Sequence, residues 1–312
     1  MTLAILCSGQ GGQHREMFAL TGDAPEAAHL FARATVLLGG KDPRDFVRGE
    51  ADEALHRNRA GQILCTLQPL AAVSALVDVV PRGTIIAGYS VGEVAAWGVG
   101  GLFDATATLD LVARRAEAMD AATTAGGGLI FVRGLSREEV DRLCTRHGAA
   151  IAIVNPGNAF VVGGDREALV RISVDARVMH AARIVTLPIE VASHTKRLAA
   201  ASAVFREALR QASAVFPPRN GARILTGIDA APVVSLDASL DKLAAQISHT
   251  VQWADCLQAC VEAGATGFLE LGPGHALRGM AAEIAPTLPA RSFDEFRTLQ
   301  GVRAWVARHL GD

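Results

Sequence analysis

The chain has 312 residues, 50% of them hydrophobic, and a formal net charge of -2 at pH 7. This length allows one large domain, or a large domain that carries a smaller one. No run approaches the roughly 18 to 20 apolar residues of a membrane span, and dispersed arginines give no electrostatic footprint for nucleic acid. The N-terminal segment lacks the basic region of a signal peptide, so we expect a cytosolic protein without membrane or nucleic-acid partners.

The first part of the chain alternates strand and helix patterns. Thr2 to Ser8 has the pattern of a buried strand, and the apolar spacing from Gln62 to Val79 predicts a helix. A short β-branched strand follows at Thr84 to Ala87, then a helix from Val91 onward and another at Asp104 to Ala122. Strands that alternate with helices predict a parallel, doubly wound α/β sheet.

A second pattern begins after Ala125 to Gly128, which we expect to be a flexible joint. Ser136 opens a helix and forms a capping box with Glu139. With a strand at 129–132, two strands around 155–158, a helix from 165 and a strand at 184–187, the order is β-α-β-β-α-β. This order is ferredoxin-like. We therefore predict an α/β core at 1–125 and 188–312 with an inserted ferredoxin-like subdomain at 126–187.

The cysteines do not suggest a disulfide framework or a metal site. They lie scattered at Cys7, Cys65, Cys144, Cys256 and Cys260. The last two are four residues apart and would share one face of a helix, but no second pair with metal-ligand spacing accompanies them. We expect buried structural thiols, and neither a metal nor a cofactor.

The segment from Gly88 to Gly92 matches the G-x-S-x-G nucleophile motif. It stands between a predicted strand and a predicted helix, which is the context that the motif requires. The sharp turn would expose the Ser90 hydroxyl at the carboxyl edge of the sheet. The Val91 N–H would lie at the start of a helix, where a developing oxyanion is favoured. The alternative is a plain strand-to-helix turn.

A serine nucleophile needs a base. The candidate is His194, in the segment from Leu187 to His194, but other histidines compete, including His14, His249 and His275. Spacing alone does not choose among them, because a single histidine is more often structural than catalytic.

A glycine-rich turn, Gly9 to Gln13, follows the first predicted strand at the same sheet edge as Ser90. It lacks the lysine of a phosphate-binding P-loop and the full dinucleotide spacing. One interpretation is a tight turn without further role. The other is that this turn, with Gln10, supplies a second hydrogen-bond donor to an oxyanion, opposite the Val91 N–H.

These segments and several later ones resemble the malonyl-CoA:acyl carrier protein transacylase family, in the family's order and across nearly the whole chain. The segments are Gly9 to Gln13, Gly88 to Glu93, Leu111 to Met119 around Arg115, Asn155, Ser193 with His194, Val251 to Trp253, and Glu270 to Gly274. The resemblance implies an α/β hydrolase-like core with a ferredoxin-like insert, which agrees with the pattern above. It also implies malonyl-CoA and an acyl carrier protein as partners.

The resemblance implies a role for each matching residue. Ser90 would be the nucleophile and His194 its base, with Gln10 and Val91 at the oxyanion hole. The substrate-site residues would be Arg115, which would hold the malonyl carboxylate, Asn155 at the subdomain junction, and Gln252, whose backbone carbonyl would orient His194. A carbonyl can replace the acid of a triad, because it accepts from the other ring nitrogen of the histidine.

The chain departs from the family pattern at two positions. Tyr89 replaces the usual histidine beside the serine, and Gly12 replaces a serine in the first loop. With the opening Cys7 to Gln13, these features are more similar to the branch that serves malonate decarboxylase, its epsilon subunit, than to the branch of fatty-acid synthesis. A transacylase of fatty-acid or polyketide synthesis is the alternative.

Two other classes of protein remain open. An α/β-hydrolase esterase or thioesterase would have the chain order Ser, acid, His with a late histidine, and His194 lies mid-chain. A non-catalytic scaffold is the second, although the sequence retains each expected catalytic group. Arg114, Arg183, Lys196 and Arg197 are candidates for contacts with coenzyme A phosphates or an acidic carrier.

Overall fold

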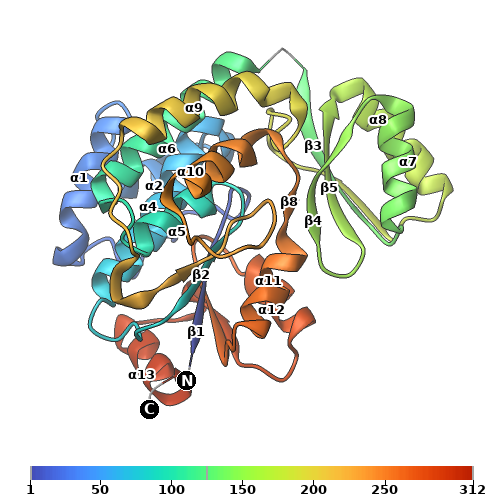
Figure 1. Cartoon of the computed structure of the whole chain (residues 1–312). Helices are drawn as coiled ribbons and strands as arrows, with labels where there is room; N and C mark the ends of the chain where they lie inside the picture. The colour runs from blue at the N-terminus through green and yellow to red at the C-terminus, as the bar shows by residue number, and fades with distance from the viewer. Residues whose placement is uncertain (1, 124–125, 311–312) are drawn as a thin grey trace.

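The computed structural model describes residues 2–123 and 126–310. A parallel sheet of five strands forms its centre (Figure 1), in the spatial order β10-β9-β1-β2-β7. Its strands are β1 Leu3–Cys7, β2 Ile85–Gly88, β7 Arg223–Ile224, β9 Gly267–Leu271 and β10 Ala290–Ser292.

Helices cover both faces of this sheet (Figure 1). On one side, or flanking it, are α1 Ala28–Leu37, α2 Pro43–Gly49, α3 Asp52–His56, α4 Asn58–Ala75, α5 Gly92–Val99, α6 Ala105–Ala122, α9 Ala199–Gln211, α10 Leu236–Ala245 and α13 Leu299–Leu310. On the other are α11 Trp253–Glu262 and α12 Ala276–Ile284. Short 3-10 turns are η1 Pro25–Ala27, η2 Lys196–Leu198, η3 Arg219–Gly221, η4 Gln246–Ser248 and η5 Phe293–Glu295.

The side chains of β1 alternate between the two faces of the parallel sheet, and both of these faces are buried. Leu3 and Ile5 belong to the hydrophobic cluster that includes α4, α5 and α6, whereas Ala4 and Leu6 belong to the cluster with α11 and α12. Successive strand residues point to opposite faces, so a strand buried on both sides is continuously apolar. The expected parallel α/β arrangement is therefore present. Both Cys256 and Cys260 are buried in the second cluster.

A second sheet lies to one side of the core (Figure 1), in the order β6-β3-β5-β4-β8. Its strands and helices are β3 Gly127–Arg133, α7 Arg137–His147, β4 Ala150–Asn155, β5 Ala159–Asp165, α8 Arg166–Val178, β6 Arg183–Thr186 and β8 Val251–Gln252. The first four strands are antiparallel and follow β-α-β-β-α-β along the chain. The boundaries 126 and 187 stay our proposed division of the chain.

Three details differ from the sequence-based expectations. Gly127 and Gly128 are the first residues of β3 and pair with β5, so they are not a flexible joint; Ala125 lies outside the described residues. Helix α4 begins four residues before Gln62, where the Asn58 side chain donates to the Ala116 carbonyl of α6, and it ends at Ala75, four residues before Val79. The strand β8 was not expected; it joins the subdomain sheet, parallel to β4, and leads into the core helix α11.

None of the helices in the described residues combines the length and the apolar content that a membrane span requires.

Candidate active site

Three loops meet at the carboxyl edge of the parallel sheet. Cys7 of β1 pairs with Gly88 of β2 and with Leu271 of β9, so these strands end at the same level. The loop after β1, the turn that holds Ser90, and the loop Gly272–Gly274 therefore lie together, at the edge where open α/β sheets bind ligands.

Ser90 stands on a strained turn between β2 and α5. Its φ is +56°, in the left-handed region that residues other than glycine rarely adopt. The turn is tight because α5 begins against β1: a Cβ atom on Gly92 would overlap the carbonyl oxygen of Cys7. This is the strand-turn-helix geometry of a nucleophile elbow.

The structure brings His194 to Ser90. The distance between Ser90 Oγ and His194 Nε2 is 2.7 Å, and the distance between His194 Nδ1 and the backbone oxygen of Gln246 is 2.6 Å. A carbonyl oxygen can only accept, so Nδ1 carries the ring hydrogen and Nε2 is free to take the serine proton. The backbone N–H of His194 also donates to the Ile247 carbonyl at 2.8 Å, and its φ is +61°.

The expected role of Gln252 is not what the structure shows. The carbonyl that orients His194 belongs to Gln246, six residues earlier in the chain. Gln252 instead ends β8, where its N–H donates to the Gly227 carbonyl at 2.7 Å. A main-chain acceptor carries no side-chain signature, so the motif around Gln252 could not identify the residue that supplies it.

The protein environment keeps His194 neutral. Burial, together with the positive charge of Arg115, lowers its pKa to about 3, although the hydrogen bond to Gln246 acts in the opposite direction. A neutral imidazole is the form that can accept the proton of a serine.

Arg115 is a buried cation that makes no ion pair with any carboxylate of the described residues. It is 1% exposed, and it donates to the amide oxygens of Gln62 at 2.6 Å and of Gln246 at 3.1 Å. Its Nε has no acceptor in the described structure. Burial lowers the pKa of Arg115 to about 10, so the guanidinium stays charged at neutral pH. An isolated buried charge is costly, and a site that holds one is suited to an anionic ligand.

The expected oxyanion donors are both free of backbone acceptors. Within residues 2–123 and 126–310, neither the Gln10 N–H nor the Val91 N–H donates to a protein group. The Gln10 side chain turns toward α4, with its Nε2 3.5 Å from the Asn58 oxygen. The loop is anchored behind it, since Ser8 Oγ donates to the buried carboxylate of Glu270 at 2.7 Å.

Tyr89 and Asn155 lie beside the nucleophile. The Tyr89 ring packs edge-to-face on Trp253, with ring centroids 5.4 Å apart. Burial raises the pKa of Tyr89 to about 12, and the neighbouring Asn155 side chain opposes that rise. Asn155, at the end of β4, is buried, and its amide makes no hydrogen bond of full geometry in the described structure, although the side chain lies close enough to Tyr89 to lower its pKa. Buried amides without a full hydrogen bond are rare, so Asn155 has capacity for a further contact.

Three residues of the site were not identified from the sequence. Gln62 and Gln246 hold Arg115, and Glu93 accepts a hydrogen bond from the Gln246 side chain at 2.8 Å. Glu93 had a usable signal, because it is the last residue of the Gly88 to Glu93 motif and lies in the first turn of an otherwise apolar helix. The two glutamines had none.

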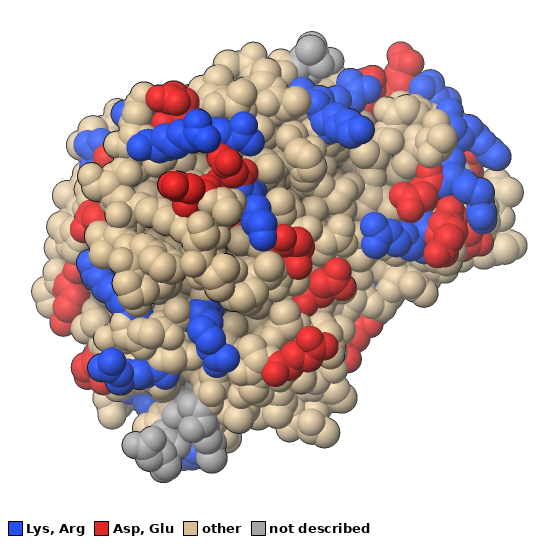
Figure 2. All heavy atoms as spheres, viewed as in Figure 1, with Lys and Arg blue, Asp and Glu red and all other residues tan. Residues whose placement is uncertain are grey.

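Half of the arginines in the subdomain, four of eight, form ion pairs. Figure 2 shows blue and red side chains interleaved over α7 and α8, where Arg137 pairs with Asp141 and Arg171 with Glu167. Of the candidate contacts to coenzyme A or carrier, Arg197 is bound to Asp165 at 2.7 Å. No single-sign field covers this face.

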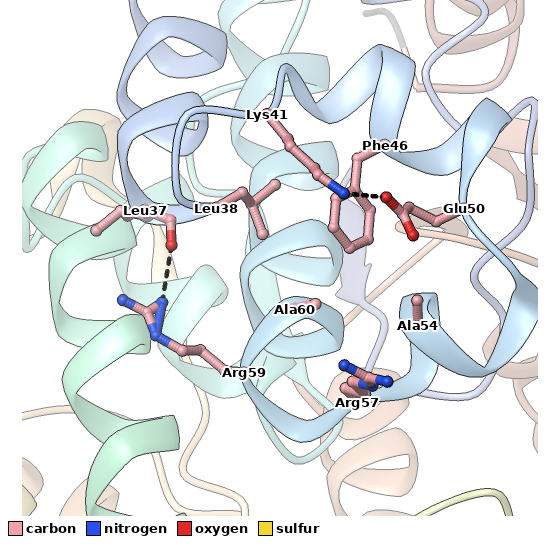
Figure 3. A pocket seen from close by; sticks show the side chains of 9 residues that line it. All are labelled: Leu37, Leu38, Lys41, Phe46, Glu50, Ala54, Arg57, Arg59 and Ala60. Carbon is pink, nitrogen blue, oxygen red and sulfur yellow. Dashed lines mark hydrogen bonds and ion pairs between the residues drawn. The ribbon is translucent and has the colours of Figure 1, made fainter.

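A separate pocket of about 300 Å³ lies among α1, α2, α3 and α4 (Figure 3). Leu37, Leu38 and Phe46 line it, with an ion pair between Lys41 and Glu50 at its rim. None of the residues discussed above as catalytic or substrate-binding lines this pocket.

Comparison with known proteins agrees with this geometry over nearly the whole chain. Residues 5–289 match the acyl transferase domain family. The malonyl CoA-acyl carrier protein transacylase of Mycobacterium tuberculosis is 28% identical over 294 residues, covering 93% of this chain and 95% of that protein.

Solved structures show the same fold. An acyl-carrier-protein S-malonyltransferase from Burkholderia pseudomallei superposes with a TM-score of 0.89 at 25% identity, covering 97% of this chain and 100% of that one. A type II PKS acyl-carrier protein in complex with its malonyl-transacylase gives a TM-score of 0.89 at 25% identity, over 97% and 99% of the two chains. The predicted α/β fold is confirmed.

Proposed function

This chain belongs to the acyl transferase domain family, and from that premise we propose that it moves a malonyl group from malonyl-CoA to the thiol of an acyl carrier protein. The observation that carries the proposal is the buried Arg115, which has no carboxylate partner among the residues that the structure describes and is held by the same Gln246 that orients His194. The names of the relatives described above support malonyl as the acyl group.

The proposed reaction has two half-reactions that share one covalent intermediate. In the first, Ser90 Oγ attacks the thioester carbonyl carbon while its proton passes to His194 Nε2. The oxyanion that forms would accept from the N–H groups of Gln10 and Val91. The C–S bond then breaks, and the leaving thiolate takes the proton back from Nε2, giving malonyl-Ser90 and coenzyme A.

The second half-reaction reverses these roles. The carrier thiol gives its proton to His194 Nε2, and its sulfur attacks the ester carbonyl of malonyl-Ser90. Collapse of the oxyanion breaks the bond to Ser90 Oγ, which recovers the proton from the imidazolium. Each half-reaction returns Ser90 and His194 to their starting protonation states, as a ping-pong cycle requires.

The free carboxylate of the malonyl group would meet Arg115. A guanidinium can bind both carboxylate oxygens, which holds the acyl carbonyl in register with Ser90. Asn155 is the other proposed substrate contact, through its amide, which makes no hydrogen bond of full geometry in the described structure. We no longer assign the His194-orienting role to Gln252; it stays a proposed residue of the substrate mouth only by its place beside Trp253.

The test is intact-mass analysis of the protein after incubation with malonyl-CoA. We expect one malonyl adduct on wild type, its transfer to a carrier thiol, and no adduct on a folded Ser90→Ala variant. An adduct that forms at a comparable rate on Ser90→Ala would overturn the assignment of the nucleophile. A wild-type adduct that only hydrolyses, with no transfer to any carrier, would favour a thioesterase.

We further propose that the carrier is the subunit of a malonate decarboxylase, in the cytosol, where coenzyme A thioesters are metabolised. The support is Tyr89, which replaces the family's histidine at the nucleophile. Gly12 supports this less than the sequence suggested: any Cβ there would overlap the Pro273 carbonyl, so loop packing alone accounts for it. The alternative, a carrier of fatty-acid or polyketide synthesis, is favoured by the names of the relatives.

A further inference from the structure

Four groups of the site converge on one residue, Gln246. Its backbone oxygen accepts from His194, and its side-chain oxygen accepts from Arg115 at 3.1 Å. Its side-chain nitrogen donates to the backbone oxygen of Ser90 and to the carboxylate of Glu93, both at 2.8 Å. Gln246 therefore touches the proposed nucleophile, base and carboxylate-binding cation at once.

The side-chain amide of Gln246 has one orientation that satisfies all its partners. An amide nitrogen has two hydrogens to donate, and an amide oxygen only accepts. The two acceptors, on Ser90 and Glu93, use both hydrogens, and Arg115, which only donates, requires the oxygen on its side. A flipped amide would oppose its nitrogen to the guanidinium and its oxygen to the backbone oxygen of Ser90, which only accepts.

Glu93 is one of the three groups that hold this orientation. It lies in the first turn of α5, three residues after Ser90, and its own N–H donates to the Ser90 oxygen at 3.0 Å. It is fully buried, and burial raises its pKa to about 8. The Gln246 amide stands between this carboxyl group and Arg115, so the two do not form an ion pair that would occupy the guanidinium.

We propose that Glu93 is a positioning residue for the transfer reaction: it fixes the Gln246 amide, which in turn aims Arg115 at the acyl carboxylate beside Ser90. This inference rests on the proposed malonyl transfer. A carboxyl group buried without a direct ion pair is a costly choice for packing alone. The free-energy cost of burying Glu93 is explained if the orientation of Gln246 determines how well the site distinguishes a charged acyl group from an uncharged one.

The test compares four single variants for kcat/KM with malonyl-CoA and with acetyl-CoA. Glu93→Ala leaves one Gln246 hydrogen without an acceptor, so malonyl transfer should fall about 10- to 100-fold while acetyl transfer falls far less. Glu93→Gln keeps an acceptor oxygen and should restore most of the malonyl preference. Glu93→Asp keeps the carboxyl group but withdraws the acceptor, so it should resemble Glu93→Ala. Gln246→Ala keeps the backbone carbonyl for His194 and should also lose the preference.

The double variant Glu93→Ala/Gln246→Ala tests whether Glu93 acts through Gln246. Its malonyl loss should equal that of Gln246→Ala alone, whereas independent roles would multiply the two losses. If Glu93→Ala fails to fold, the comparison of Glu93→Gln with Glu93→Asp carries the test. Equal losses in those two, or an unchanged malonyl-to-acetyl ratio in every folded variant, would overturn the proposal.

Glu270→Gln is the matched control, since it changes the other buried carboxylate of the sheet edge. Glu270 holds Ser8 and the N–H of Arg278 and does not touch Gln246. Any loss there should be equal for the two substrates. Failure of the proposed function looks different, because wild type itself would then form no malonyl-Ser90 adduct.

Discussion

The two residues of the proposed proton transfer both have left-handed backbone conformations, φ +56° at Ser90 and +61° at His194. Each such residue costs of order 1–3 kcal/mol, which the surrounding structure must offset. Around His194 that support is visible: its N–H and its ring each donate to the η4 turn, at Ile247 and Gln246. Strain at both partners fixes their side chains at 2.7 Å before a substrate arrives.

Comparison of two inactive variants of Ser90 measures this strain. Ser90→Ala keeps the strained backbone, whereas Ser90→Gly relieves it, because glycine adopts positive φ without a Cβ clash. We expect Ser90→Gly to unfold with a free energy about 1 kcal/mol higher than Ser90→Ala in denaturant titrations. Equal stabilities would show that the turn is not strained.

The low pKa of His194 predicts that the rate of Ser90 acylation declines at an unusually low pH. The neutral imidazole is the base, and burial lowers its pKa to about 3, far below an ordinary histidine. The rate constant of Ser90 acylation should therefore stay level as the pH falls from 7 to 5, and decline only near the lowered pKa. Single-turnover acylation at a series of pH values measures this. A decline centred near 6.5 would contradict a buried, neutral His194.

The same pKa shift also makes the free energy of unfolding depend on pH. The dependence is opposite to that of a histidine whose pKa is raised by a salt bridge. The unfolded chain takes up a proton at His194 near pH 6.5, while the folded chain resists it until about pH 3. The unfolded state binds more protons in that window, so the free energy of unfolding falls as the pH drops from about 6.5 toward 3. The stability of the fold must therefore be measured at each pH at which the acylation rate is measured.

Arg115 should set the choice between acyl groups. Arg115→Ala removes the only partner we propose for the malonyl carboxylate, and should cost about 3 kcal/mol or more in malonyl transfer, the scale for a broken buried charge pair. Acetyl transfer should be spared or improved. The measurement is kcat/KM for malonyl-CoA and acetyl-CoA, with Arg115→Lys as the control that keeps charge without the planar fork. Equal losses on both substrates would mean that Arg115 supports the fold.

At the scale of the element, the loop after β1 and the loop after β9 pack so closely that a side chain at Gly12 does not fit between them. A Cβ atom on Gly12 would overlap the backbone carbonyl of Pro273, in the loop after β9. Gly12→Ala should therefore lower the free energy of unfolding by roughly 1–3 kcal/mol, as overpacking does, and slow acylation by displacing Gln10. Gly279→Ala, in α12, is the matched control: a Cβ there meets nothing within 4 Å. It should be neutral or slightly stabilising. A harmless Gly12→Ala would refute the interlock.

Elements with a strong local signal could be predicted, and those defined by tertiary contacts could not. The helix with the Asp104 cap and the capping box of Ser136 with Glu139 both stand where the sequence indicates them. The strand β8 has two residues and exists because it pairs with β4. The error at Gln252 has the same origin, since the carbonyl that meets His194 is placed by the η4 turn and any residue type could supply it.

At the scale of the whole molecule, Tyr89 lies where the core meets the subdomain. Tyr89 follows β2 of the core, Asn155 ends β4 of the subdomain, and Trp253 begins α11 directly after β8 of the subdomain sheet. The Tyr89 ring is fixed edge-to-face on Trp253. The residue beside Ser90 is thus held in an aromatic contact, at the position where the resemblance to the transacylase family leads us to expect a histidine.

The last prediction is that Tyr89 contributes to the choice of carrier. The comparison is the rate of malonyl transfer from malonyl-Ser90 to a malonate decarboxylase carrier and to a fatty-acid carrier, each with its native prosthetic group. We expect wild type to prefer the decarboxylase carrier about tenfold or more, which corresponds to only about 1.4 kcal/mol of differential binding in the transition state. Tyr89→His should reduce this preference, because a polar ring replaces the aromatic wall on Trp253. Tyr89→Phe is the control that keeps the ring, and it should retain the preference for the decarboxylase carrier.

Loading of Ser90 from malonyl-CoA is measured separately, so that a damaged nucleophile elbow is not mistaken for an altered choice of carrier. A clear wild-type preference for the fatty-acid carrier would reject the decarboxylase assignment and leave malonyl transfer itself intact, because the Ser90, His194 and Arg115 arrangement is the same for either carrier.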